Sequence, residues 1–400
     1  MRLQDFQKLT LRRVVSQRLV KLSVVAVLAA GIQGCFEAPP METEQVGFRG
    51  VGMWSTTNPD ITDPLVALNQ VPVASPKVPA VEGAPKAGDI YQNVQVLGDL
   101  SIAEFARTMA SITAWVSPEQ GCAYCHEGGN FADDALYTKV VSRRMMQMTQ
   151  NINSQWSDHV GSTGVTCYTC HRGLNVPANI WFEQDGPVTA AGMSANSYQQ
   201  NHVGTEVGYT SMLSDPFSKY LAGEPDKIRV AAQNALPMRG ETNNEPTQAL
   251  ENTWSLMMHM SDSLGVNCTA CHNTRNFSSW EMSPPARTTA WHALQMVPAL
   301  NNDYMTPLQP IYPDHRLGSL DDAPKTNCAT CHQGINKPLY GVSMLDDYPV
   351  WRAPLEGGSL EAPDYSTAPD YGDPNNLEPV STESSAALAD PEAAAESVVQ

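Results

Sequence analysis

The sequence predicts a mainly α-helical fold with little regular β structure and long loops, built as two similar halves. Three observations support this prediction. A five-residue pattern, Cys-x-x-Cys-His, occurs four times, twice in each half of the chain. Apolar residues at helical spacing precede its copies. Stretches without periodicity separate them, and the chain of 400 residues contains 30 prolines but only 7% aromatic residues.

The repeated pattern is the strongest chemical signal in the chain. Two thiols three positions apart can add to the vinyl groups of one haem, and the adjoining histidine then becomes the proximal iron ligand. Zinc sites and redox dithiols also use Cys-x-x-Cys pairs, but neither explains a histidine after every pair. The sequence therefore predicts a tetrahaem cytochrome with four covalently bound haem c groups. The first to fourth motifs supply Cys122, Cys125 and His126; Cys167, Cys170 and His171; Cys268, Cys271 and His272; and Cys328, Cys331 and His332.

Residues 1–34 predict an export signal. Basic residues precede an apolar run, LSVVAVLAAGI at 22–32, which is too short to span a bilayer comfortably. Cys35 follows Gly34, as at a bacterial lipoprotein cleavage site, and would become the lipidated N-terminus. A retained anchor and a free thiol are the alternatives. Because two acyl chains suffice for stable anchoring, we expect a protein held at a membrane outside the cytoplasm.

Composition divides the rest of the chain into five parts. Residues 35–90 are proline-rich and predict an extended arm over another surface, or alternatively a disordered linker. Residues 91–175 and 246–352 are predicted as two haem-pair units, joined by a loop-rich connector at 176–245. Residues 353–400 contain ten acidic residues and no Lys, Arg or His, so we expect a disordered tail.

A helix is predicted before each motif. Ser101 and Glu104 form a capping-box pattern at the start of the first helix, and the second spans about 133–155. The third spans about 246–264 and ends at a glycine, and the fourth spans about 285–301. The recurring order of helix, turn and motif indicates an internal duplication.

Methionines on these helices are candidates for the sixth iron ligand. Met109 lies on the apolar stripe of the first helix and is predicted to face the haem that follows. His159 precedes the second motif and is either a neighbour of a haem or a core histidine. Spacing does not choose among the other candidates, which are Met145, Met146, Met148, Met257, Met258 and Met296.

The net charge of −18 argues against nucleic-acid binding and favours soluble basic partners. Two function classes besides a membrane-bound electron carrier are open at this level. A free-standing periplasmic tetrahaem relay to a terminal reductase commonly has His/His ligation throughout, but only five of the nine histidines lie outside the motifs. The second class is a haem enzyme such as a peroxidase, which needs a five-coordinate iron.

Four stretches of the chain resemble the tetrahaem cytochrome c subunit of the purple-bacterial photosynthetic reaction centre. They are ITAWVSPEQGCAYCH at 112–126, RRMMQMTQNINSQWSDHVG at 143–161, LGVNCTACHN at 264–273 and CATCHQGINKPLYG at 328–341. The resemblance covers about residues 91–350 and leaves the acidic tail unexplained. It implies an electron carrier, not an enzyme, on the periplasmic face of the photosynthetic inner membrane.

The partners and ligands follow from the same resemblance. A soluble donor, such as cytochrome c2 or a high-potential iron–sulfur protein, would reduce the four haems, which reduce the bacteriochlorophyll special pair held by the L and M subunits. The third-motif haem would lie nearest the special pair and the first-motif haem farthest. Arg287 would raise a haem potential, and Met296 would be core. The implied sixth ligands, in motif order, are Met109, Met145, Met257 and His159.

Overall fold

The computed structural model describes residues 41–45, 54–184, 204–210, 212, 215–225, 228, 247–277 and 279–352. Within these residues the fold is mainly helical, and the one sheet is a pair of short antiparallel strands. None of the described helices is long and apolar enough to cross a membrane. The predicted export signal, Cys35 and the acidic tail lie outside the described residues.

Four long helices precede the four motifs. They are α5 (Ile102–Val116), α6 (Tyr137–Gln155), α10 (Thr247–Leu264) and α11 (Ala286–Leu300). Each motif lies in or directly beside one short helical element. These elements are η1 (Gly121–Tyr124), α8 (Cys167–His171), η3 (Cys268–Ala270) and α12 (Cys328–His332).

The remaining elements are short. The first group comprises β1 (Glu42–Gln45), β2 (Trp54–Thr57), α2 (Pro59–Thr62), α3 (Pro64–Leu68), α4 (Ala87–Ile90), α7 (Ser157–Val160), η2 (Thr205–Val207) and α9 (Phe217–Tyr220). The second comprises the π-helical η4 (Asn301–Met305) and the 3-10 elements η5 (Thr306–Ile311), η6 (Asp314–Arg316), η7 (Pro338–Gly341) and η8 (Pro349–Trp351).

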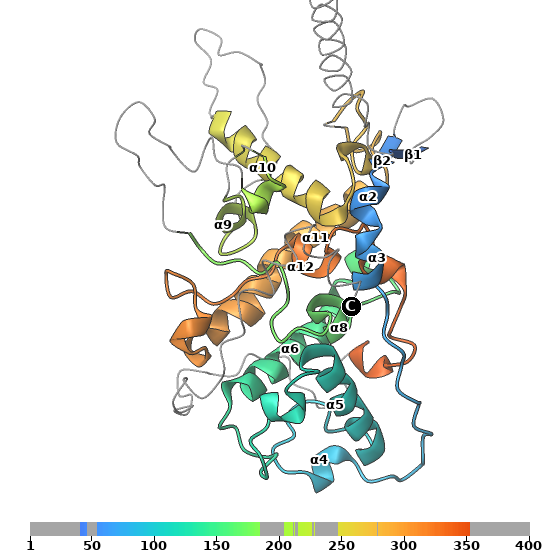
Figure 1. Ribbon diagram of the computed structural model, residues 1–400, viewed down its shortest axis with the longest axis vertical. Coiled ribbons are helices and arrows are strands. Elements are labelled where there is room, and N and C mark those ends of the chain that lie inside the picture. The colour runs from blue at the N-terminus through green and yellow to red at the C-terminus, as the bar shows by residue number, and fades with distance from the viewer. Residues whose placement is uncertain are drawn as a thin grey trace, which may run out of the picture.

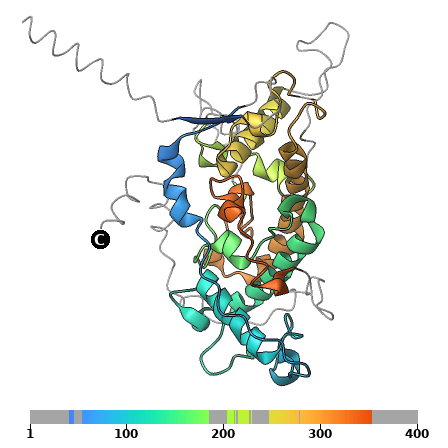
Figure 2. The ribbon, with the colours of Figure 1, turned by 90° about the vertical axis from the view of Figure 1, so that its right-hand side faces the viewer.

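The helices follow one another along the long axis of the molecule. Helix α10 contacts α12, α12 contacts α8, and α8 contacts α5. Figure 1 shows this order from α10 near the top to α5 near the bottom, with α8 and α12 between them. In the perpendicular view the same vertical order is kept (Figure 2). The short elements that carry the second and fourth motifs therefore occupy the middle of the fold.

Two of the three core clusters among the described residues join elements that are far apart in the sequence. One joins α6, α9, α10, α11 and η4, and includes the fully buried Leu221 and Leu256. The other packs the end of the described chain against α5, where the Trp115 and Tyr348 rings meet edge to face with centroids 4.7 Å apart. Burying such aromatic pairs contributes about 0.5–1.5 kcal/mol beyond the area term. Residues that follow the fourth motif thus pack on the helix that precedes the first.

The start of α6 corrects the sequence prediction. We expected this helix to begin near Asp133, but it begins at Tyr137. The Asp133 side chain accepts a hydrogen bond from the Ala135 amide, and the Asn130 side chain accepts one from the Ala132 amide. Such side-chain caps favour turns over a continuing helix, so the first four residues of the predicted helix remain a loop.

The start of α5 agrees with the prediction in part. The Ser101 hydroxyl accepts a hydrogen bond from the Glu104 amide, as an N-cap does. The Glu104 carboxylate does not return to the cap, because it pairs with Arg107 at 2.8 Å. The helix start was therefore predicted correctly, whereas the reciprocal half of the capping box is replaced by an ion pair.

The end of α10 brings the fourth motif against this helix. Gly265 has φ of +60°, the Val266 amide donates to the Ser261 carbonyl, and the Gly265 amide donates to the Asp262 carbonyl. This is a Schellman ending. A Cβ on Gly265 would lie 2.1 Å from the Gly334 carbonyl oxygen, so only glycine allows this close backbone approach.

The proline-rich arm lies against α5 and the end of the described chain. Between α3 and α4 it has no regular structure. The Ser75 amide donates to the Tyr348 hydroxyl at 3.0 Å, and Arg107 Nη2 donates to the Ser75 carbonyl at 2.9 Å. Lys77 pairs with Asp347 at 3.1 Å. These contacts connect the arm to α5 and to the end of the described chain.

Candidate haem sites

The first and third motifs share one local geometry. Each lies beside a short 3-10 turn, and each histidine places Nδ1 near the carbonyl of the residue five positions later. The distances are 3.2 Å from His126 to Phe131 and 3.0 Å from His272 to Phe277. The same phenylalanine rings contact the imidazoles, with centroids 4.9 and 5.2 Å apart.

The second and fourth motifs share a different geometry. Each is a short α-helix whose histidine places Nδ1 near the carbonyl three residues later, at 2.8 Å for His171 and 3.1 Å for His332. The next residue is left-handed in both, with φ of 49° at Arg172 and at Gln333. A capping box begins each helix, and the two boxes pair Thr166 with Thr169 and Asn327 with Thr330.

The carbonyl contacts fix the tautomer of all four motif histidines. A carbonyl oxygen can only accept a hydrogen bond, so the Nδ1 atom facing it carries the proton. The Nε2 lone pair is then available to a metal, which is the arrangement of haem-ligating imidazoles. Burial lowers the pKa of each motif histidine, and for His332 burial together with the neighbouring His159 imidazole lowers it to about 4. Each ring is therefore neutral at physiological pH, as ligation requires.

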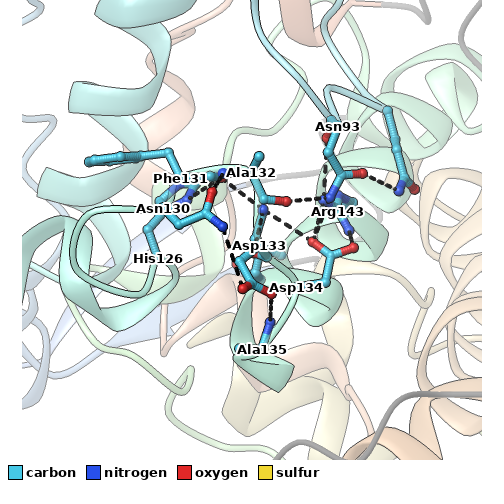
Figure 3. Close-up of polar contacts among 12 residues, drawn as sticks. Asn93, His126, Asn130, Phe131, Ala132, Asp133, Asp134, Ala135 and Arg143 are labelled. Atoms are coloured by element: carbon cyan, nitrogen blue, oxygen red, sulfur yellow. Dashed lines mark hydrogen bonds and ion pairs between the residues drawn. The ribbon is translucent and has the colours of Figure 1, made fainter.

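The loop after the first motif holds the carbonyl that orients His126. Lys139 Nζ donates to the same Phe131 carbonyl at 2.9 Å. Asp134 pairs with Arg143 at 2.7 Å, and Figure 3 shows this pair beside the loop. Burial would raise the pKa of the Asp134 carboxyl, but hydrogen bonds from Arg143, a neighbouring asparagine and Lys139 lower it to about 2. The carboxylate stays charged at neutral pH and keeps the loop in place.

His159 lies opposite the fourth motif. Its ring centroid is 6.0 Å from that of His332, although His159 comes from α7 in the first half of the chain. Its Nδ1 lies 3.1 Å from the Thr289 carbonyl, so its Nε2 is also available to a metal. The fold thus brings together two imidazoles that the sequence leaves far apart.

His259 differs from these five histidines. It is 4% exposed on α10, and its Nδ1 lies 2.9 Å from the Glu206 carbonyl. Its Nε2 lies 3.3 Å from the Ser263 hydroxyl. Both ring nitrogens are engaged by protein groups, so His259 is a satisfied core histidine in this geometry.

The exposed fraction of the side chain divides the methionines that are candidates for the sixth iron ligand into two groups. Met109, Met145 and Met257 are each partly exposed at the edge of a core cluster. Three rivals are buried among protein side chains and expose less of their surface. They are Met146, Met148 and Met296, with 9%, 8% and 7% exposure. Met258 is also partly exposed, so burial does not separate it from its neighbour.

A hydroxyl four positions after the methionine is a signal that our sequence analysis missed. Thr113 Oγ1 donates to the Met109 carbonyl at 2.9 Å and lies 4.0 Å from Cys122 Sγ. Thr149 donates to the Met145 carbonyl at 2.9 Å, and its side chain also hydrogen-bonds the first cysteine of the second motif. A serine follows Met257 at the same spacing, whereas no hydroxyl follows the rival methionines there. At the first two motifs this hydroxyl therefore lies on the helix face that meets a motif cysteine.

Arg287 lies close to the third motif. Its Nη1 donates to the Ser279 carbonyl at 2.8 Å and to the Ser283 hydroxyl at 2.9 Å, and its guanidinium carbon lies 4.1 Å from the Trp280 ring centroid. Burial lowers the pKa of His272, and the Arg287 charge adds to this effect. A fixed positive charge therefore acts at the third motif.

The donor set fits haem c. All eight motif cysteines are free thiols, and each motif pairs them with a histidine whose Nε2 is available. Partly exposed thioethers lie on the helices that precede the first three motifs. Thioether attachment needs the thiols, and low-spin iron needs nitrogen or sulfur on both faces. A mainly helical fold with such sites defines a c-type cytochrome.

Comparison with known proteins identifies the family. The family described as the photosynthetic reaction centre cytochrome c subunit matches residues 37–352. The chain is 48% identical to the photosynthetic reaction center cytochrome c subunit of Rubrivivax gelatinosus, over 83% of this chain and 89% of that protein. It is 46% identical to the corresponding subunit of Thermochromatium tepidum, over 84% and 80%, and 40% identical to that of Roseobacter denitrificans, over 86% and 93%. The chain therefore belongs to this family.

Family membership confirms the resemblance and the central functional prediction. The protein is an electron-transfer subunit of the photosynthetic reaction centre, carries covalently bound haem c and is associated with the photosynthetic membrane. Electron transfer in the reaction centre is favoured over the free-standing relay. The family match begins at residue 37 and so includes the proline-rich arm, whereas residues 353–400 lie beyond it.

Proposed function

We propose that this subunit passes electrons from a soluble periplasmic donor through four haem c groups to the photo-oxidised special pair held by the L and M subunits. The observation that carries the proposal is the set of five imidazoles with an available Nε2, one in each motif and one opposite the fourth. Bound haem iron would supply reversible one-electron chemistry at each motif.

The proposed ligand set closes both faces of every iron. Met109, Met145 and Met257 serve the first, second and third motifs, and His159 serves the fourth. Their partial exposure and the short distance between the His159 and His332 rings support these assignments. Because thioether sulfur favours ferrous iron, the three His/Met haems have higher potentials than the His/His haem. With no open coordination position, the subunit carries electrons and does not transform a substrate.

We also propose two pseudo-symmetric haem-pair halves. The shared geometry of the first and third motifs, and the different geometry shared by the second and fourth, support a duplication of one pair. Helices α10, α12, α8 and α5 contact one another in this order. The order supports a linear path for electrons with the third motif at one end and the first at the other. The third motif faces the special pair in this proposal, and the first receives electrons from the donor.

The membrane attachment is proposed from the sequence. An acylated Cys35 would hold the subunit on the periplasmic face, where the donor and the special pair are both within reach. Mass spectrometry of the native subunit tests this point directly, because acylation adds a defined mass to a chain that begins at Cys35. A mature chain that retains residues 1–34 would contradict cleavage.

The test of the proposed function uses the native complex. We expect four haems per chain by the pyridine haemochrome assay, and we expect the subunit to re-reduce the pigment cation formed by a flash. Complexes from which the subunit has been removed are the control and should keep the cation oxidised. Fewer than four attached haems, or an equally long-lived cation with the subunit present, would contradict the proposal.

Salt dependence tests the nature of the donor. The acidic chain, with a net charge of −18, should steer a basic donor, so the second-order rate of reduction should fall as ionic strength rises. Stopped-flow reduction of the complex at several salt concentrations measures this. A rate that does not change with salt would indicate an apolar docking surface, as expected for a high-potential iron–sulfur donor.

A further inference from the structure

The second and fourth motifs hold each other by reciprocal hydrogen bonds. Arg172 Nη2 donates to the Cys331 carbonyl at 3.2 Å, and Gln333 Nε2 donates to the Cys170 carbonyl at 3.1 Å. The two donors occupy the same left-handed position, directly after the motif histidine. The Cys170 and Cys331 sulfurs are 3.0 Å apart between them. We call this contact between the second and fourth motifs, made by Arg172, Gln333, Cys170 and Cys331, the joint. It is pseudo-symmetric in its backbone and in its hydrogen bonds.

The joint is not symmetric in charge. A guanidinium is positively charged at all accessible pH values, whereas the amide of Gln333 is neutral. Arg172 Nε and Nη1 are buried and have no hydrogen-bond partner among the described residues. None of the ion pairs in the described part of the chain includes Arg172. Arg172 thus places in the middle of the fold a positive charge that no described carboxylate pairs with, and its guanidinium carbon lies 5.7 Å from the Tyr168 ring centroid.

The position of the guanidinium decides which site this charge serves. Arg172 belongs to the second motif, but its side chain crosses to the fourth and binds the carbonyl of Cys331, the residue before His332. A charge that is shielded from water and lies this close to the fourth motif interacts strongly with any charge at that motif. The reason is that the effective dielectric constant around it is far below that of water. A positive charge stabilises ferrous haem relative to the ferric form, which carries one more positive charge.

We propose that Arg172 raises the reduction potential of the haem of the fourth motif. The inference rests on the proposed function, since it requires a haem at that motif with His159 and His332 as ligands. His/His ligation lowers the potential of this haem, and Arg172 offsets part of that decrease. Arg172 is a potential-setting residue and not a ligand. Gln333 keeps the equivalent hydrogen bond in the other direction without adding a charge.

Three variants of the native complex test the proposal. Arg172→Gln removes the charge and gives both sides of the joint the same side chain. Arg172→Lys keeps the charge. Gln333→Ala removes the reciprocal hydrogen bond without changing the charge. Haem content and the electron paramagnetic resonance signal of the bis-histidine haem are recorded first for the wild type. Redox titration then follows that signal in each variant.

We expect Arg172→Gln to lower the ratio of ferrous to ferric bis-histidine haem at a fixed potential by about tenfold, which is about 59 mV for a one-electron couple. Arg172→Lys should restore most of the ratio, and Gln333→Ala should leave it unchanged. An unchanged ratio in Arg172→Gln, or equal losses in Gln333→Ala, would overturn the inference and indicate a purely structural joint. Absence of a bis-histidine signal in the wild type would instead contradict the proposed ligand set.

Discussion

Replacing Met257 by leucine is expected to abolish the high-potential midpoint of the third-motif haem. Leucine has a similar volume but no thioether sulfur, so the iron would lose its proposed sixth ligand while the helix packing is largely kept. Axial ligands set haem potentials over about 0.8 V, so we expect a decrease on the order of 100 mV. Redox titration of the complex measures the midpoint, and optical spectra should show one haem changing from low spin to high spin.

Met258→Leu is the matched control. The two methionines are adjacent on α10, and successive side chains on a helix are about 100° apart, so they point in different directions. Both are partly exposed, and burial does not choose between them. The control should leave all four midpoints in place. If Met258→Leu removes the high-potential midpoint while Met257→Leu retains it, the ligand assignment at this motif is wrong.

Replacing His159 by methionine is expected to have an effect of opposite sign at the fourth motif. Thioether sulfur in place of an imidazole favours ferrous iron, so the potential of this haem should rise, again on the order of 100 mV. The bis-histidine signal should disappear from the electron paramagnetic resonance spectrum, and the redox titration should show four high-potential steps.

His292→Met is the control for that substitution. His292 lies on α11 near His159 and contacts the Trp291 ring, with centroids 5.2 Å apart. His292 is another histidine of this region and is therefore an alternative source of the ligand. A bis-histidine signal that survives His159→Met and disappears in His292→Met would assign the ligand to α11.

The sequence predicted the long helices well and their ends less well. Apolar spacing and the Ser101 cap located α5, and the glycine after Leu264 located the end of α10. The predicted start of α6 was wrong because the side chains of Asn130 and Asp133 cap turns that compete with the helix. Hydrophobic periodicity does not detect such turns. Sequence alone also did not predict that residues after the fourth motif would pack against α5.

The amino-acid sequence by itself predicted where haem would be attached and which histidine would lie beneath each iron. Both follow from spacing within a few consecutive residues, so no tertiary information is needed. Only the tertiary structure decided which methionines keep an exposed edge, that His159 meets His332, and that Arg172 crosses from the second motif to the fourth. These relations depend on which helix faces meet, and residues distant in sequence meet only after the whole core has packed.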